Sequence, residues 1–243
     1  MNNEDLIKIA ETDIRASKIL YDNKLYTQAL FYFQQSVEKV SKYIGLQMAC
    51  ISESMLKNIS HDPTKVFAKM FSHLSDKCDG VLPPINPHEI TNAKQIVQQT
   101  DEHIATAVLK QNINEIIKAP NPINTYGKSE FDAVIDYIST LMPDYDLGLD
   151  NPLLRKYTEV KLQEQTHNII IYINIGQRLL LLLMLYSLFL SRYKVDDFRY
   201  LSESFGNPIN YFNDEHAFVI ELKNHIYLMS SYIIPNSLNI TWC

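Results

Sequence analysis

Apolar residues recur every three or four positions over two consecutive stretches at the start of the chain. Such spacing places the recurring residues on one face of an α-helix, so it predicts helices over 3–21 and 25–48. The polar break Asp22-Asn23-Lys24 between them is short, which favours an antiparallel helical hairpin. Asp13 falls on the apolar face of the first helix, where a carboxylate must be paired, hydrogen-bonded or functional. The predicted faces consist of Leu6, Ala10, Asp13, Ser17 and Leu20, and of Tyr26, Leu30, Phe33, Val37, Val40 and Ile44.

Helix start and stop signals continue along the rest of the chain. Asp62-Pro63 is typical of a helix start and Gly80 of a helix end. The stretch 169–175 is rich in isoleucine, as strands are, but no second stretch offers it a partner strand, so a helix is favoured. The sequence therefore predicts an all-α, up-down helical bundle. Its further helices are expected at 86–118, at 129–142, from Pro152, at 168–193 and at 213–233, the last ended by Pro235.

Composition narrows the functional classes without naming one. The chain has 243 residues, 46% of them hydrophobic, which excludes a disordered chain. Lysine and arginine number 22 against 28 acidic residues, a net charge of −6, so a broadly basic nucleic-acid coat is excluded, while a local basic face stays open. Six glycines argue against a glycine-rich phosphate loop.

The compartment expected from the sequence is a reducing cytoplasm. The acidic start of the chain lacks the pattern of a secretory signal. Cys50, Cys78 and Cys243 are odd in number and far apart, so free thiols are expected. The apolar run 179–190 is too short for a membrane span of about 20 residues, which favours a buried helix and no membrane contact.

Four stretches of this sequence resemble the HEPN domain, a family of nucleotide-binding helical bundles. They are Asp13-Ile14-Arg15-Ala16, then the segment 26–42 with its Gln-Gln-Ser-Val-Glu-Lys core, Ser60-His61-Asp62, and Arg199-Tyr200. Ser36 stands where the family pattern has Ala, and Leu201-Ser202 departs from its late motif. The spacing is similar to the family over 3–79 and 180–233. We therefore expect one HEPN-like domain over 1–243, with 81–167 as a helical insertion or extension.

The resemblance implies pairing as a homodimer, and it raises the question of ribonuclease activity. Active HEPN ribonucleases need no metal and use an Arg followed four to six residues later by a His. None of the five arginines here has such a His, and the smallest gap is from Arg155 to His167. Lys57 stands four residues before His61, but a lysine lacks the planar fork of a guanidinium. HEPN proteins without the motif accompany small nucleotidyltransferases or act as binding partners in defence and toxin–antitoxin systems, and this chain is more similar to that class.

The candidate site residues follow from these motifs. A polar cluster between the first two helices is expected from Asp13, Gln35, Glu38 and Lys42, with a hydrogen-bond network that fixes helix register as the alternative. His61 and Asp62 open a helix, where free N–H groups attract anions, or they simply cap it. Arg199 and Tyr200 could contact a ligand, or the Arg could brace a carboxylate. No metal and no cofactor are expected, because Glu164-x-x-His167 lacks the second such motif of di-iron bundles.

Three functional hypotheses result. The first is a non-catalytic HEPN homodimer that binds a nucleotide, a nucleic acid or a protein partner such as a nucleotidyltransferase, in a defence or toxin–antitoxin system. The second is an unorthodox metal-independent ribonuclease or toxin that uses His61 as acid and base, with Lys57, Lys42 or Arg199 as phosphate anchors. The third is a structural helical adaptor whose partner surface is 81–167.

Overall fold

The computed structural model describes residues 3–59, 61–77, 87–119, 152–198, 200–202 and 205–240. The chain divides into two compact units, one formed by residues 1–117 with 178–243 and the other by residues 118–177. The described residues are helical apart from turns and one isolated bridge, Ser202 to Gly206, so the all-α prediction is confirmed. The helix predicted at 129–142 lies outside the described residues.

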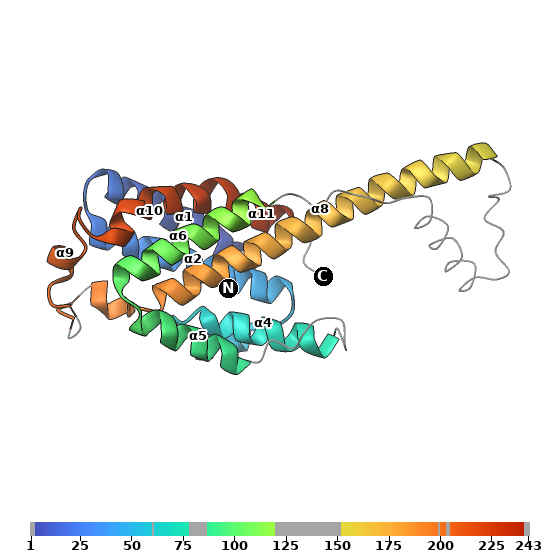
Figure 1. Cartoon of the computed structure of the whole chain (residues 1–243). Coiled ribbons are helices and arrows are strands. Elements are labelled where there is room, and N and C mark those ends of the chain that lie inside the picture. The colour runs from blue at the N-terminus through green and yellow to red at the C-terminus, as the bar shows by residue number, and fades with distance from the viewer. Residues whose placement is uncertain are drawn as a thin grey trace. The chain divides into compact units, whose positions relative to one another are not determined.

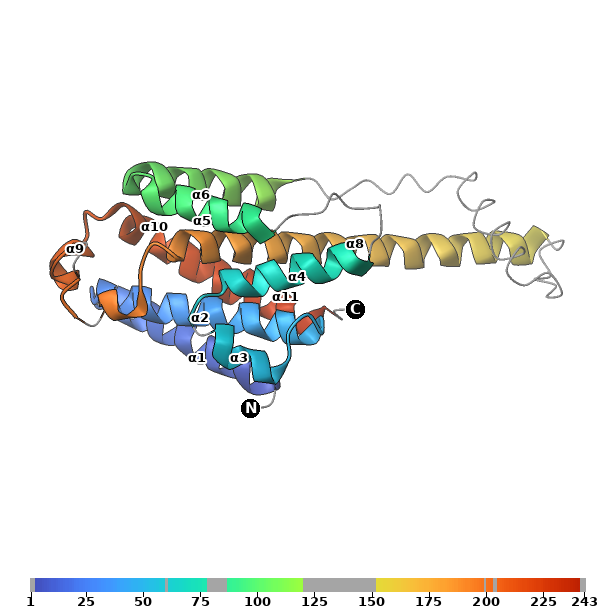
Figure 2. The same cartoon turned by 90° about the horizontal axis from the view of Figure 1, so that it is seen from below.

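The predicted hairpin is present in the first unit. Helix α1 (Asn3–Asp22) and helix α2 (Tyr26–Gln47) run antiparallel and lie side by side in both views (Figure 1, Figure 2). Lys24 closes the turn between them with φ of 60°. The apolar face of α2 is fully buried at Leu30, Phe33, Val37, Val40 and Ile44.

Two short helices and a longer one follow the hairpin. The 3₁₀ turn η1 (Glu53–Met55) and α3 (Leu56–Ile59) were not predicted, and α4 (Thr64–Lys77) packs on α2. The start predicted at Asp62-Pro63 is confirmed, because Asp62 Oδ1 accepts the backbone N–H of Thr64 at 3.2 Å. The predicted end at Gly80 lies outside the described residues.

The single helix predicted over 86–118 is wrong. The structure has α5 (Pro87–Gln99) and α6 (Glu102–Lys118), separated by Thr100 and Asp101. Asp101 Oδ1 accepts the backbone N–H groups of His103 at 2.9 Å and Ile104 at 3.3 Å, which starts a new helix. An aspartate side chain can thus replace a backbone partner and interrupt an otherwise periodic segment.

The long helix α8 (Pro152–Leu190) joins two predicted segments into one. The helical interpretation of 169–175 and the start at Pro152 are therefore confirmed, although the helix ends at Leu190 instead of 193. Its part in the first unit is largely buried, at Leu179, Leu182, Leu183 and Tyr186, whereas Leu181 is exposed. Among the described helices none is both long and apolar enough to span a membrane.

The predicted stop at Pro235 is also wrong. After η2 (Val195–Phe198) and α9 (Pro208–Tyr211), helix α10 (Ala217–Leu228) continues through a π-helical turn, η3 (Met229–Ile233), into α11 (Ile234–Asn239). Pro235 lies in the first turn of α11, where its missing N–H is tolerated. The wider π turn directly before it lets the helix pass the ring. The start lies at Ala217, four residues after the predicted Asn213.

Candidate functional site

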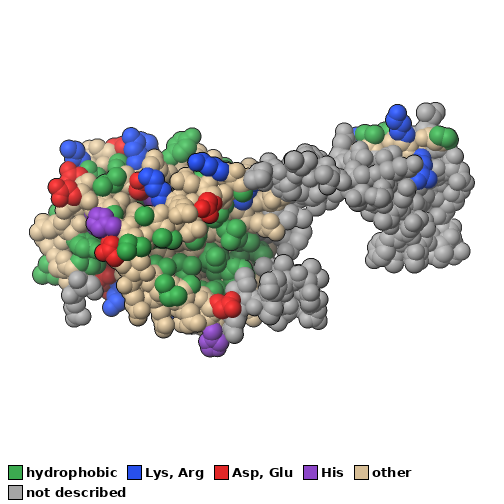
Figure 3. All heavy atoms as spheres, viewed as in Figure 1, with side chains coloured by type: hydrophobic (Ala, Val, Ile, Leu, Met, Phe, Trp, Pro, Cys, Tyr) green, Lys and Arg blue, Asp and Glu red, His purple; other side chains and the backbone are tan. Residues whose placement is uncertain are grey.

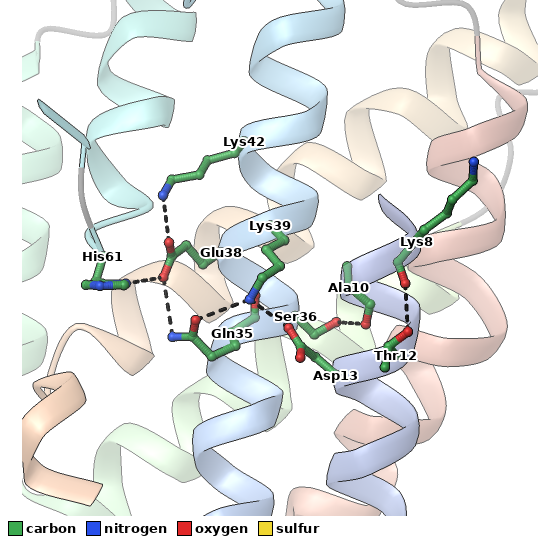
Figure 4. A network of polar contacts seen from close by, with 10 residues as sticks. All are labelled: Lys8, Ala10, Thr12, Asp13, Gln35, Ser36, Glu38, Lys39, Lys42 and His61. Atoms are coloured by element: carbon green, nitrogen blue, oxygen red, sulfur yellow. Dashed lines mark hydrogen bonds and ion pairs between the residues drawn. The ribbon is translucent and has the colours of Figure 1, made fainter. Parts of the chain in front are cut away.

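A lysine and an aspartate join α1 to α2 on a half-buried face. Lys39 Nζ of α2 donates to Asp13 Oδ2 of α1 at 2.7 Å and to Gln35 Oε1 at 3.2 Å (Figure 4). The side chains of Asp13 and Lys39 are 12% and 18% exposed. Ser36 Oγ also donates to the carbonyl oxygen of Ala10 at 3.0 Å. These contacts set the register of the hairpin, because they tie fixed positions of the two helices together.

Glu38 is the centre of the second half of this network. Its Oε1 accepts from Lys42 Nζ at 2.6 Å, and its Oε2 lies 3.0 Å from His61 Nδ1. Gln35 Nε2 donates to the same Oε2 at 3.5 Å. The Glu38 side chain is 6% exposed, whereas His61 is 59% exposed. When the Nδ1–H of His61 donates to the carboxylate, its Nε2 is left for other partners.

The structure therefore brings together five of the predicted site residues in one network. Gln35, Lys42 and His61 each contact Glu38 directly, as Figure 4 shows. Asp13 joins them through Lys39, which the sequence analysis missed. The signal for Lys39 is its position four residues after Gln35, on the face of α2 that meets Asp13.

Asp62 belongs to a neighbouring contact at the start of α4. Its Oδ1 accepts from Thr64 Oγ1 at 2.5 Å, and its Oδ2 accepts from Lys94 Nζ of α5 at 2.6 Å. Burial raises the pKa of Asp62, but the hydrogen bonds from Lys94 and Thr64 and the charge of Lys94 outweigh burial, so its pKa lies below the ordinary value of 3.8. Asp62 is thus ionised at neutral pH and anchors α5 beside α4.

The late motif has a different position. Tyr200 is 66% exposed and is not part of the network around Glu38. Arg199 lies outside the described residues, so its predicted role stays a prediction. The side chains of Glu164 and His167 are likewise outside the described part of the chain. Among the described residues, no group of three or more His, Cys, Asp or Glu side chains could hold a metal ion.

His61 and Asp62 also border a cavity of about 450 Å³ in the first unit. Its wall combines residues of α2, α4, α5, the end of α8 and the turn after α8, which are far apart in the sequence. Small-molecule sites commonly have volumes of about 300–1,000 Å³. The polar and charged residues that line it include Gln34, His61, Asp62, Lys65, Lys94, Ser187, Lys194 and Asp196.

Three lysines and two aspartates give the cavity a positive balance. Lys94 is paired with Asp62, whereas Lys65 and Lys194 are exposed and have no ion pair among the described residues. Asp196 is exposed and offsets one of these two charges. The sequence analysis did not select Lys65 or Lys194, because single surface lysines carry no spacing signal. The lysines of the cavity can attract an anionic group to a position beside His61.

The comparisons with known proteins concern the same hairpin. Residues 3–50 match the family model of the HEPN domain, a range that covers α1 and α2 with the network residues Asp13, Lys39 and Glu38. No curated protein and no solved structure matches the chain. The resemblance predicted from the motifs is therefore confirmed over the first two helices, which form the HEPN-like part of this chain.

Proposed function

We propose that this protein is a non-catalytic HEPN-type protein that binds a phosphate-bearing ligand of the nucleotide class in the cavity beside His61. The observation that carries the proposal is the convergence of Lys65, Lys94, Lys194 and His61 on one recess. This recess borders the Glu38 network, which lies on the HEPN-like hairpin. Lysine ammonium groups bind phosphate as point charges, so they suit binding without the bidentate clamp of an arginine.

The chemistry of the lining residues supports binding over cleavage. Metal-independent cleavage of RNA needs one group that removes a proton from the 2′-hydroxyl and another that protonates the leaving oxygen. His61 can supply one of these groups. Asp62 is a poor acid because its pKa lies below the ordinary value and Lys94 holds it ionised. Within the described lining of the cavity, His61 is the one imidazole.

The test measures binding and cleavage on the same purified protein. Isothermal titration calorimetry with AMP, GMP, CMP and UMP should detect binding of at least one nucleotide. Incubation with a labelled 12-nucleotide RNA should give no cleavage products. Lys65→Gln should weaken nucleotide binding several-fold, and Lys69→Gln should not, since Lys69 is exposed one turn further along α4 and is outside the cavity lining. Lack of binding by all four nucleotides would contradict the proposal.

A second candidate function is the unorthodox ribonuclease, which one observation favours. Buried Glu38 contacts Nδ1 of exposed His61 at 3.0 Å, and a carboxylate that orients an imidazole in this way is common in general acid–base catalysis. RNA cleavage that His61→Ala abolishes would select this function over the first. Expression in a bacterial host gives an independent readout, namely growth arrest that the same substitution relieves.

The adaptor hypothesis has support in α5 and α6, which lie within its predicted partner surface. An apolar groove of about 330 Å³ lies between these helices and α8, and Ile96, Ile104 and Val108 beside it are 65%, 58% and 50% exposed. Figure 3 shows hydrophobic side chains gathered on this face of the first unit.

Light scattering on the purified chain tests the homodimer part of the proposal, since a monomer has a mass of 28.2 kDa. Deletion of 81–167 that abolishes partner capture but keeps the dimer would favour the adaptor.

A further inference from the structure

Two residues that line the cavity each have a buried polar atom without a hydrogen-bond partner. These atoms are Oε1 of Gln34 on α2 and Oγ of Ser187 on α8. Gln34 is 4% exposed and Ser187 is 0% exposed. A buried polar atom that lacks a partner costs about 1–3 kcal/mol, and folded proteins leave few such atoms. Two of them in the lining of one recess therefore call for a partner from outside the chain.

The orientation of the Gln34 side chain follows from its neighbours. Its Nε2 donates to the backbone carbonyl oxygens of Leu190 at 3.3 Å and Tyr193 at 3.2 Å. Carbonyl oxygens only accept, so the amide nitrogen must face them, and Oε1 is left as an acceptor. A ligand that satisfies Gln34 must then donate an N–H or O–H group. Ser187 is less restrictive, because a hydroxyl both donates and accepts.

The charged residues and the two unpartnered atoms impose different demands on one ligand. Lys65 and Lys194 at the cavity favour an anionic group, and Gln34 requires a hydrogen-bond donor. A nucleoside monophosphate has both, since its phosphate is anionic and its ribose hydroxyls and base N–H groups donate. Inorganic phosphate supplies the anionic charge, but it has no ribose hydroxyl and no base N–H group.

We propose that Gln34 and Ser187 are specificity-determining residues that bind the sugar or base of a nucleoside monophosphate, while Lys65 and Lys194 bind its phosphate. This inference rests on the proposed function and deepens it, because it assigns recognition of the nucleoside to two named residues of the same cavity.

Ser187→Ala provides a sharp test because Ser187 Oγ has no protein partner to lose. The thermal midpoint of this variant should equal or exceed that of the unsubstituted protein, because an unsatisfied buried hydroxyl is removed. Its affinity for AMP, GMP, CMP or UMP, whichever binds best, should fall about tenfold in calorimetry, while its affinity for inorganic phosphate should not change. A tenfold loss corresponds to about 1.4 kcal/mol.

Thr106→Val is the matched control. Thr106 Oγ1 of α6 is also buried without a partner, and Thr106 is not part of the cavity lining. Its substitution should leave both stability and nucleotide affinity nearly unchanged. If nucleotides bind and Ser187→Ala keeps full affinity, this inference is wrong and the proposed function stands. If none of the four nucleotides binds the unsubstituted chain, both are wrong.

Discussion

Lys39 reaches from α2 to Asp13 on α1, with 2.7 Å between Nζ and Oδ2, and both side chains are less than one-fifth exposed. A charge pair in this setting matters most when one partner is removed, because the other charge then remains half-buried without compensation. The contact therefore fixes how the two helices align more than it adds to stability by itself.

Removal of either partner should destabilise the hairpin. We expect Asp13→Ala and Lys39→Ala each to lower the free energy of unfolding by about 2 kcal/mol, measured by urea denaturation. The double variant should lose much less than the sum, because it leaves no unpaired charge. Lys18→Ala is the control and should cost less than about 0.5 kcal/mol, since Lys18 and Asp22 are 67% and 46% exposed. Additive losses in the double variant would contradict this account.

Gly45 should not tolerate a side chain. A Cβ at this position of α2 would lie 2.7 Å from Val66 Cγ1 of α4 and 3.0 Å from Ile51 Cδ1. Alanine improves helix propensity by about 1 kcal/mol, but overpacking against two buried residues costs about 1–3 kcal/mol. Gly45→Ala should thus lower the thermal midpoint. Val66→Ala should lower the midpoint less in the Gly45→Ala variant than in the unsubstituted protein. A higher midpoint for Gly45→Ala would show that α4 can move away.

Stability should fall between pH 7.5 and pH 5. Burial lowers the pKa of His225 to about 4, an effect that the nearby charge of Glu221 only partly offsets. The unfolded chain, with a histidine pKa near 6.5, then binds the proton more readily, so stability rises with pH from about 4 to 6.5 and is level above. His216, whose pKa burial also lowers, acts in the same direction. The expected loss for His225 alone between pH 7.5 and pH 5 is about 2 kcal/mol.

The hydrogen bond between Tyr186 and His225 determines which variant best tests the pH dependence of stability. Tyr186 Oη lies 3.0 Å from His225 Nδ1, and burial raises the tyrosine pKa, so the phenol donates and Nδ1 accepts. The double variant Tyr186→Phe/His225→Phe removes the titrating group and both polar partners together. Its stability, measured by urea denaturation at both pH values, should depend less on pH. An unchanged pH dependence would assign the effect to other groups.

Glu102 should hold α6 against the end of α8. Its two carboxylate oxygens accept from Arg192 Nε at 3.1 Å and from Tyr193 Oη at 2.5 Å, and Arg192 Nη1 also donates to the carbonyl oxygen of Thr100 at 2.8 Å. Glu102→Gln removes the charge that opposes Arg192, so amide hydrogen exchange in α6 should accelerate about tenfold. Glu115→Gln on the exposed side of the same helix should change it little. Equal exchange in both variants would show that apolar packing alone fixes α6.

The sequence by itself determined the all-α class, the hairpin and most of the polar network, because these depend on residues near one another in the chain. Periodicity over 3–21 and 25–48 identifies the two inner faces, and the Glu38–Lys42 spacing is local. The tertiary structure decided what depends on distant partners. Gln34 meets carbonyl oxygens 156 and 159 residues away, and Lys94 meets Asp62 across 32 residues. The break at Asp101 and the continuation of the last helix beyond Pro235 were missed for a different reason, because both features are local. Side-chain capping by Asp101 and a π turn before Pro235 override the signals from apolar periodicity and from the proline there.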